Sequence, residues 1–177
     1  MKNKNKILSL CLVFSLLIGF ALNVSAADYY WTVDNSDSSG YGASGTWSTY
    51  TSSGCYSGSA RYIASTNSSS YTNWYKSYSG IWINYIDMEL YLNSANWNDT
   101  NSKYILYYYA KSGSQRSTTV YVNQNTWPTG WKACIGYLAT EECLSNRNVG
   151  VYLYPSGLSN KTTGSDAIYL HLNSNIT

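Results

Sequence analysis

The stretch Ile86-Asp87-Met88-Glu89-Leu90-Tyr91-Leu92 decides the fold, because apolar and polar side chains alternate along its whole length. Successive side chains of a β-strand point to opposite faces, so the alternation predicts a strand with one buried face and one wet face. The stretches Val149–Tyr154 and Ile168–Leu172 alternate in the same way. The sequence therefore predicts sheets that cover a common core with one face each.

Strand-like segments fill most of the remaining chain and are separated by clusters of Ser, Gly, Asn and Thr. Many short strands at such spacing are typical of an all-β sandwich or barrel. Helical periodicity is absent apart from one turn expected at Thr140–Ser145. The predicted strands are Tyr29–Val33, Thr46–Tyr50, Ala60–Ala64, Tyr71–Tyr75, Ile86–Leu92, Lys103–Lys111, Ser117–Val122, Trp131–Leu138, Val149–Tyr154 and Asp166–Leu172.

The segment Tyr104–Ala110 differs from the others because it is apolar on both faces. Strands that read as continuous apolar runs are usually buried on both sides. We therefore expect it to be a central strand, covered above and below.

The N-terminal segment has the composition of a secretory signal peptide. Three lysines in Met1–Lys6 precede the apolar run Ile7–Leu22, and Val24-Ser25-Ala26 offers the small residues that a signal peptidase reads. We expect a signal peptide over residues 1–26 and a single β-sandwich domain over residues 27–177. The apolar run is short for a membrane span of about 20 residues, so an exported, extracellular protein with no membrane span is predicted.

Removing the 26 residues would leave 151 of 177, and would remove three of the eleven Lys and Arg but none of the nine Asp and Glu. The net charge would change from +2 to −1, which offers no basic patch for nucleic acid. The chain also contains 20 Tyr and 7 Trp but only 2 Phe. Aromatic rings with a polar tip favour surfaces, so many of them are expected where the protein meets water or a partner.

Several blocks of this tyrosine-rich sequence follow one another in a recognisable order: Val33–Asp37, Ala43–Trp47, Tyr104–Ala110, Gly130-Trp131 with Ile135–Tyr137, Val149–Leu153 and Asp166–Leu170. In this order they resemble the golvesin C-terminal-like domain, also called the xanthan lyase carbohydrate-binding-like domain. The resemblance implies a jelly-roll-like antiparallel β-sandwich that accompanies exported enzymes or cell-surface proteins and binds carbohydrate. In such a sandwich the first and last strands lie side by side.

The turn Asp34–Gly40 has two readings. Its Asp, Asn and Ser side chains favour an ordered turn, in which they bond the local backbone. Its oxygens also suit Ca²⁺, and adjacent first and last strands would bring Asp166 to the same place. We hypothesise a structural calcium site formed by Asp34, Asp37 and Asp166.

Three cysteines follow the signal segment: Cys55, Cys134 and Cys143. Cys134 and Cys143 enclose eight residues, a spacing that suits a disulfide clip in an oxidising compartment. Sequence alone does not determine pairing, so a fully reduced set is the alternative.

Aromatic residues in polar loops are the candidates for ligand binding. Trp97 lies in Ser94–Asn101 and Trp127 in Asn123–Pro128, both rich in Asn. Rings that stack on sugars and amides that bond hydroxyls are what a carbohydrate site requires, so we expect a polysaccharide or cell-wall glycan as partner. Each of these rings could instead cap the core. A second candidate platform is Trp74-Tyr75, while Trp47, Trp82 and Trp131 are expected in the core.

Catalysis is less favoured than binding, and no catalytic residue is predicted. His171 is the only histidine and falls on the wet face of its strand. Asp87 and Glu89 share one exposed strand face, where solvated carboxylates are common.

A third class of function is that of a small secreted structural or antagonistic protein, which binds itself, another protein or a cell envelope. Many exposed aromatics and only 11% charged residues would leave apolar patches for such contacts. The oligomeric state is not determined by the sequence.

Overall fold

The computed structural model describes residues 28–78, 83–93, 96–143 and 147–174, without the side chains of residues 141–143. The predicted signal peptide and Trp82 lie outside these residues. The described chain forms β-strands and short 3₁₀ turns. They are β1 (Asp28–Asp34), β2 (Tyr41–Ser44), β3 (Ser48–Thr51), η1 (Tyr56–Gly58), β4 (Ser59–Ala64), β5 (Tyr71–Ser77), β6 (Ile83–Leu92), β7 (Ser102–Tyr109), β8 (Gln115–Val122), η3 (Gln124–Thr126), β9 (Gly130–Cys143), β10 (Asn148–Tyr154), β11 (Thr162–Ser165) and β12 (Ala167–Asn173).

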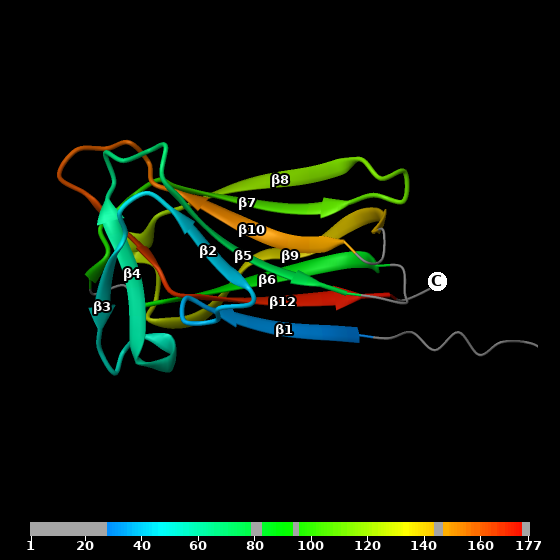
Figure 1. Cartoon of the computed structure of the whole chain (residues 1–177), viewed down its shortest axis with the longest axis horizontal. Coiled ribbons are helices and arrows are strands. Elements are labelled where there is room, and N and C mark those ends of the chain that lie inside the picture. The colour runs from blue at the N-terminus through cyan, green and yellow to red at the C-terminus, as the bar shows by residue number, and fades with distance from the viewer. Residues whose placement is uncertain (1–27, 79–82, 94–95, 144–146, 175–177) are drawn as a thin grey trace, which may run out of the picture.

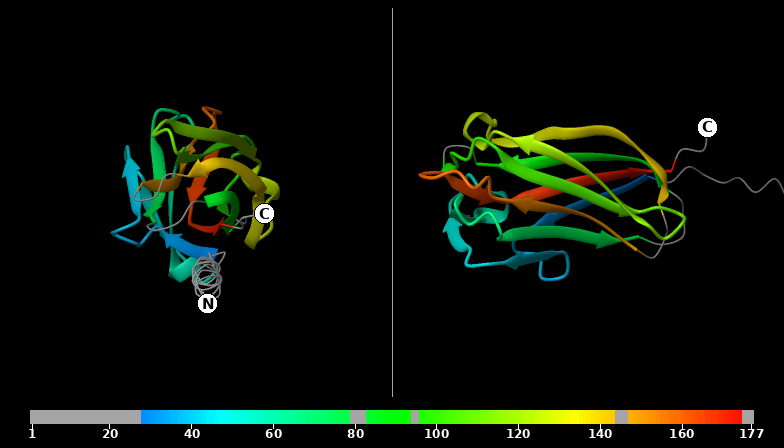
Figure 2. Two further views of the ribbon diagram at one scale, coloured as in Figure 1. Left: turned by 90° about the vertical axis from the view of Figure 1, so that its right-hand side faces the viewer. Right: turned by 90° about the horizontal axis from the view of Figure 1, so that it is seen from above.

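The strands form two large antiparallel sheets and one small one. The four-stranded sheet has the order β1-β12-β6-β9, and the five-stranded sheet has the order β2-β5-β10-β7-β8. These two sheets face each other, while β3 and β4 of the small sheet β11-β4-β3 stand across one end (Figures 1 and 2). The predicted all-β, jelly-roll-like sandwich is confirmed.

The core lies between the two large sheets and is made by alternate positions of their strands. Ile86, Met88 and Leu90 of β6 face inward, and Val151 and Leu153 of β10 approach from the other sheet. Each side chain is at most 1% exposed. The period-two pattern of the sequence therefore predicted which face of β6, β10 and β12 is buried.

The ten predicted strands all overlap observed ones, but two short strands were missed. β2 and β11 have the sequences YGAS and TTGS, which lack apolar alternation and are rich in turn-forming residues. They form because longer neighbours, β5 and β4, supply backbone partners. The helical turn expected at Thr140–Ser145 is wrong as far as Cys143, because β9 continues to that residue.

The tyrosine-rich strand β7 is interior to its sheet, between β10 and β8. Tyr104 and Leu106 face the core, but Lys103 and Tyr109 lie half-buried on the outer side. The expectation that another layer covers both faces is wrong. The outer tyrosines of this sheet pack on one another instead.

The first and last strands pair along their whole length, from Asp28 opposite Asn173 to Asp34 opposite Ala167. This pairing confirms the expected meeting of the two ends and is visible as the blue and red ribbons of Figure 1. It also places Asp166 next to the turn that follows β1.

The small sheet is held to the sandwich by Trp97 and a buried polar network. The Trp97 ring is 3% exposed and lies between Tyr50 and Tyr62, with centroid distances of 5.5 and 5.9 Å. Gly164 of β11 lies against its face, since a Cβ added there would stand 2.3 Å from a ring carbon. Gln124 closes the contact by accepting from the Gly164 amide at 2.9 Å and donating to its carbonyl at 2.8 Å.

We expect Gly164→Ala to destabilise the protein by about 1–3 kcal/mol, because a methyl group there must displace the Trp97 ring. Chemical or thermal unfolding measures the effect. Gly42→Ala is the matched control, since its added methyl meets nothing within 4 Å. Equal stability of the two variants would contradict the packing described for Trp97.

Candidate binding site on the four-stranded sheet

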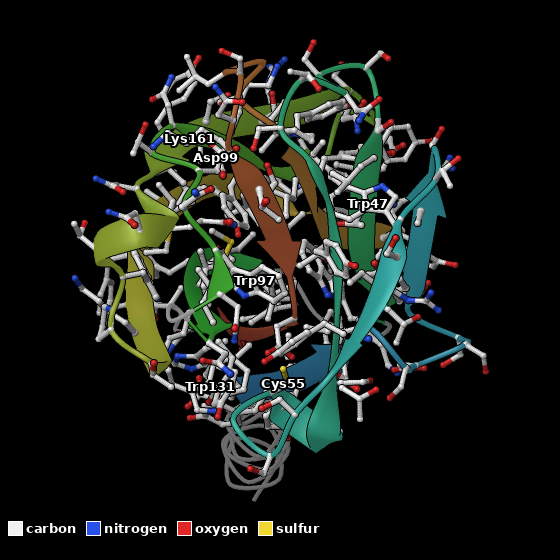
Figure 3. All side chains as sticks on the ribbon, turned by 90° about the vertical axis from the view of Figure 1, so that its left-hand side faces the viewer. Trp47, Cys55, Trp97, Asp99, Trp131 and Lys161 are labelled. Atoms are coloured by element: carbon white, nitrogen blue, oxygen red, sulfur yellow. The ribbon has the colours of Figure 1, made fainter. Side chains whose placement is uncertain are left out.

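The loop and strand aromatics predicted as a platform do not form one surface. Trp97 points into the interior of the molecule (Figure 3), and Trp74 is 1% exposed with its indole N–H donating to the Asp166 carbonyl at 3.2 Å. Both are core residues, so their placement in a surface site is wrong. Trp127 is half-buried beneath the Lys132 ammonium, which lies 4.8 Å from its ring centroid. Tyr75 is half-buried on the outer face of the opposite sheet.

A hollow of about 370 Å³ lies on the outer face of the four-stranded sheet. The strand register places Thr32 of β1, Tyr169 of β12 and Glu89 of β6 in one row across that face. Trp131 comes from the start of β9 and Tyr56 from η1. These five residues line the hollow.

Trp131 is the most prominent ring of the hollow. Its centroid lies 5.3 Å from those of Tyr56 and Tyr91 and 6.3 Å from that of Tyr169, each edge-to-face. It remains 36% exposed and lies at the periphery of the molecule, on the side of Cys55 and η1 (Figure 3). Contacts from three sides fix the ring orientation before a ligand arrives, which lowers the entropy cost of binding.

A second aromatic group continues the hollow along β1 and β12. Tyr30 stacks on Tyr169 at 6.1 Å and on His171 at 4.4 Å between centroids. His171 Nδ1 lies 3.1 Å from an Asp87 oxygen, and its Nε2 lies 3.5 Å from an Asp28 oxygen. The prediction that His171 lies on the wet face is confirmed, and its neighbours are carboxylates and a phenol ring.

Sequence reasoning missed the hollow for identifiable reasons. Trp131 was expected in the core, but the register of β6 and β9 shifts between Met88 and Glu89, so simple alternation does not transfer to β9. Tyr56 comes from a 3₁₀ turn with no periodic signal. The alternating pattern predicted that Tyr169 and Glu89 point outward. It did not predict that the rings of Trp131 and Tyr56 lie beside them.

Two of the three aspartates predicted as calcium ligands, Asp37 and Asp166, have different partners in the structure. Asp37 accepts from the Ser39 amide at 2.9 Å and faces the Lys76 ammonium at 3.9 Å, which matches an ordered turn. One oxygen of Asp166 accepts from the Tyr56 amide at 3.2 Å, and the other is buried without a partner. Across the described residues, no three His, Cys, Asp or Glu side chains gather in a way that could hold a metal ion. Calcium bound by Asp34, Asp37 and Asp166 therefore has no preformed cluster to support it among these residues and stays a hypothesis.

The predicted disulfide is also corrected. Cys134 is a free cysteine, and the single strand β9 runs through both Cys134 and Cys143. Nine extended residues span about 30 Å, far beyond the Cα separation of about 4.4–6.8 Å that a disulfide allows. Burial raises the pKa of the Cys134 thiol to about 12, which keeps it protonated and unreactive.

Comparisons with solved structures agree with this fold. The chain superposes on part of a Paenibacillus xanthan lyase with a TM-score of 0.59 and 17% identity, over 80% of this chain and 13% of the lyase. This likeness shows the fold. One weaker match is a family 35 carbohydrate-binding module from Clostridium thermocellum, with a TM-score of 0.48 and 14% identity over 82% of this chain and 98% of the module. Another is TmCBM61 in complex with β-1,4-galactotriose, with a TM-score of 0.41 and 13% identity over 80% of this chain and 86% of that protein.

No model of a protein family matches the chain, and no curated protein sequence matches it. Within the described residues no helix is long and apolar enough to cross a membrane.

We expect the stability of the protein to fall as the pH rises from about 5 to 8 because of Asp166. Burial, with a contribution from the Asp34 charge, raises the pKa of Asp166 from 3.8 to about 8. Between these values the folded state holds a proton that the unfolded state releases, so raising the pH favours unfolding. Asp166→Asn should flatten the dependence of the melting temperature on pH.

Asp37→Asn is the control, since hydrogen bonds from Ser39 lower the pKa of that carboxyl. Asp37 therefore contributes to the pH dependence of stability only below pH 5. A parent and an Asp166→Asn variant with parallel melting profiles from pH 5 to 8 would contradict the burial of this acid. The same melts with EDTA and with added Ca²⁺ test the calcium hypothesis. Bound calcium would raise the melting temperature of the parent at pH 8 but not that of Asp166→Asn.

Proposed function

We propose that this chain is a secreted, non-catalytic carbohydrate-binding module that holds a polysaccharide or cell-wall glycan in the hollow beside Trp131. The observation that carries the proposal is the exposed Trp131 ring, fixed by tyrosines next to Glu89 and Thr32. A sugar presents a face of C–H groups and an edge of hydroxyls. The hollow offers an aromatic surface for the first and oxygen acceptors for the second.

The size of the hollow suits a small part of a polymer. A volume of about 370 Å³ lies at the lower end of the range of small-molecule sites, roughly 300–1,000 Å³. The aromatic group of Tyr30 and His171 extends the surface along the sheet, so a longer chain could contact both groups. Recognition of a polymer by its side fits an open sheet face.

The carboxylates on this face support binding rather than hydrolysis. Glycosidases use two carboxyl groups about 5–9.5 Å apart across the scissile bond. Glu89 is the acid that lines the hollow, while Asp87 is engaged by His171 and by the Tyr137 amide. An acid held by a histidine and a backbone amide is poorly placed to move a proton on a sugar.

Secretion and family relationship are part of the same proposal. The signal-like sequence of residues 1–26 supports export to the extracellular space. The resemblance to the golvesin C-terminal-like domain and the fold likeness to part of a xanthan lyase support an accessory role beside polysaccharides.

We expect Trp131→Ala to weaken glycan binding by about thirtyfold or more, since truncating a central aromatic contact typically costs about 2 kcal/mol or more. Pull-down on insoluble polysaccharides and cell walls identifies the ligand, and calorimetry with its soluble fragments measures affinity. Tyr137→Asn is the control because Tyr137 is 71% exposed on the same strand, outside the hollow. Asn tolerates the positive φ of 51° at this position.

Normal affinity in folded Trp131→Ala would contradict this placement of the site. If the parent bound no polysaccharide or cell wall, the function itself would be contradicted. Size-exclusion chromatography would then test the structural or antagonistic class, which predicts association through exposed rings such as Tyr30 and Tyr137.

A further inference from the structure

The outer face of the five-stranded sheet is a second aromatic surface with a different charge. No strand of this sheet contains Asp or Glu. Figure 2 shows β5, β10 and β7 side by side along the molecule, and the register directs tyrosines from all three to the outside. The members that touch one another through their rings are Tyr71, Tyr107, Tyr152 and Tyr154.

Tyr152 lies at the centre of this group. Its ring centroid is 5.3 Å from that of Tyr71, 5.1 Å from that of Tyr107 and 6.1 Å from that of Tyr154. Tyr107 lies close over the sheet because its neighbour is Gly150, where a Cβ would stand 2.7 Å from the Tyr107 hydroxyl oxygen. The rings therefore form one packed group whose members hold each other in place, with Tyr107 buried and the other three half-buried at the surface.

Two cations flank the rings. The Lys103 ammonium lies 4.6 Å from the centroid of Tyr154, and the Arg147 guanidinium lies 5.6 Å from that of Tyr109. Lys103 and Tyr109 are six residues apart on β7, about 20 Å at roughly 3.3 Å per residue. Among the side chains that the structure describes, no ion pair includes Lys103 or Arg147. Positive charge is thus placed at both ends of an aromatic strip that contains no carboxylate.

A hollow of about 360 Å³ lies at the Lys103 end of the strip. Lys103, Tyr121 and Tyr154 line it from the sheet, and Asn101 and Ser156 add polar groups from the loops. A cation, two phenol rings and an amide thus meet in one depression. This combination can pair with an anion, stack on a sugar ring and bond a hydroxyl at the same place.

We propose that this face is a second binding site, which takes a polysaccharide whose sugars carry carboxylates. The tyrosine rings would receive the C–H faces of successive sugars, and Lys103 and Arg147 would pair with their carboxylates. The opposite face carries Asp28, Asp87 and Glu89, so it repels the same polymer. The two faces of the sandwich therefore select glycans of different charge.

Polygalacturonate tests the proposal, with its methyl ester as a ligand of the same backbone and less charge. We expect the parent protein to bind polygalacturonate, to lose affinity as salt is added, and to bind the methyl ester at least tenfold more weakly, about the effect of one charged contact. Lys103→Gln should lower the affinity for polygalacturonate by about tenfold, and Lys103→Arg should restore it. Lys132→Gln should have no effect, because Lys132 lies over Trp127 and belongs to β9 of the other large sheet.

Further variants separate this site from the opposite face and from simple charge attraction. Tyr137→Asn, which removes an exposed ring from the four-stranded sheet outside both hollows, should bind polygalacturonate like the parent. Tyr154→Ala should lose affinity for polygalacturonate although every positive charge is retained. Circular dichroism confirms that each variant is folded. The proposal is overturned if polygalacturonate does not bind, or if its methyl ester binds equally well. Polyphosphate carries negative charge but has no sugar ring. The proposal is also overturned if polyphosphate binds the parent as tightly as polygalacturonate does and binds Tyr154→Ala with the same affinity.

Discussion

The structure depends on the packing of alternate side chains between the two large sheets. Ile168, Leu170 and Leu172 of β12 are fully buried, and β12 is hydrogen-bonded on both sides, to β1 and β6. A slip of one residue would turn these side chains to water, so the register is fixed by the cost of exposing them. The same constraint directs Tyr169 and His171 outward. The core thus determines which side chains of β12 reach the candidate site.

The alternating strands could be predicted from the sequence because their period is a local property. The small sheet could be predicted only in part: β3 and β4 were expected as strands, but β11 has little apolar character and forms only where β4 offers a partner. Trp97 shows the same limit. Its local sequence is a polar loop, but its environment is made by Tyr50, Tyr62 and Gly164, which are distant in the chain.

The candidate site was predictable in its chemistry and not in its position. An excess of aromatic rings with polar tips predicted aromatic surfaces, and the structure has one on each outer face. The hollow needs Trp131 and Tyr56 to meet, which depends on a register shift in β9 and on a 3₁₀ turn. Neither leaves a periodic signal. The different charge of the two faces can be read from the sequences of single strands, because β6 carries Asp87 and Glu89 while β7 carries Lys103.

The most direct test of a glycan site beside Trp131 is an NMR titration that observes the indole N–H signals of the tryptophans. The ligand is a soluble oligosaccharide cut from the polysaccharide that retains the protein most strongly. We expect the Trp131 signal to shift with saturation, and the signals of the buried Trp74 and Trp97 to stay in place. A saturating shift at Trp127 with an unmoved Trp131 would contradict the account.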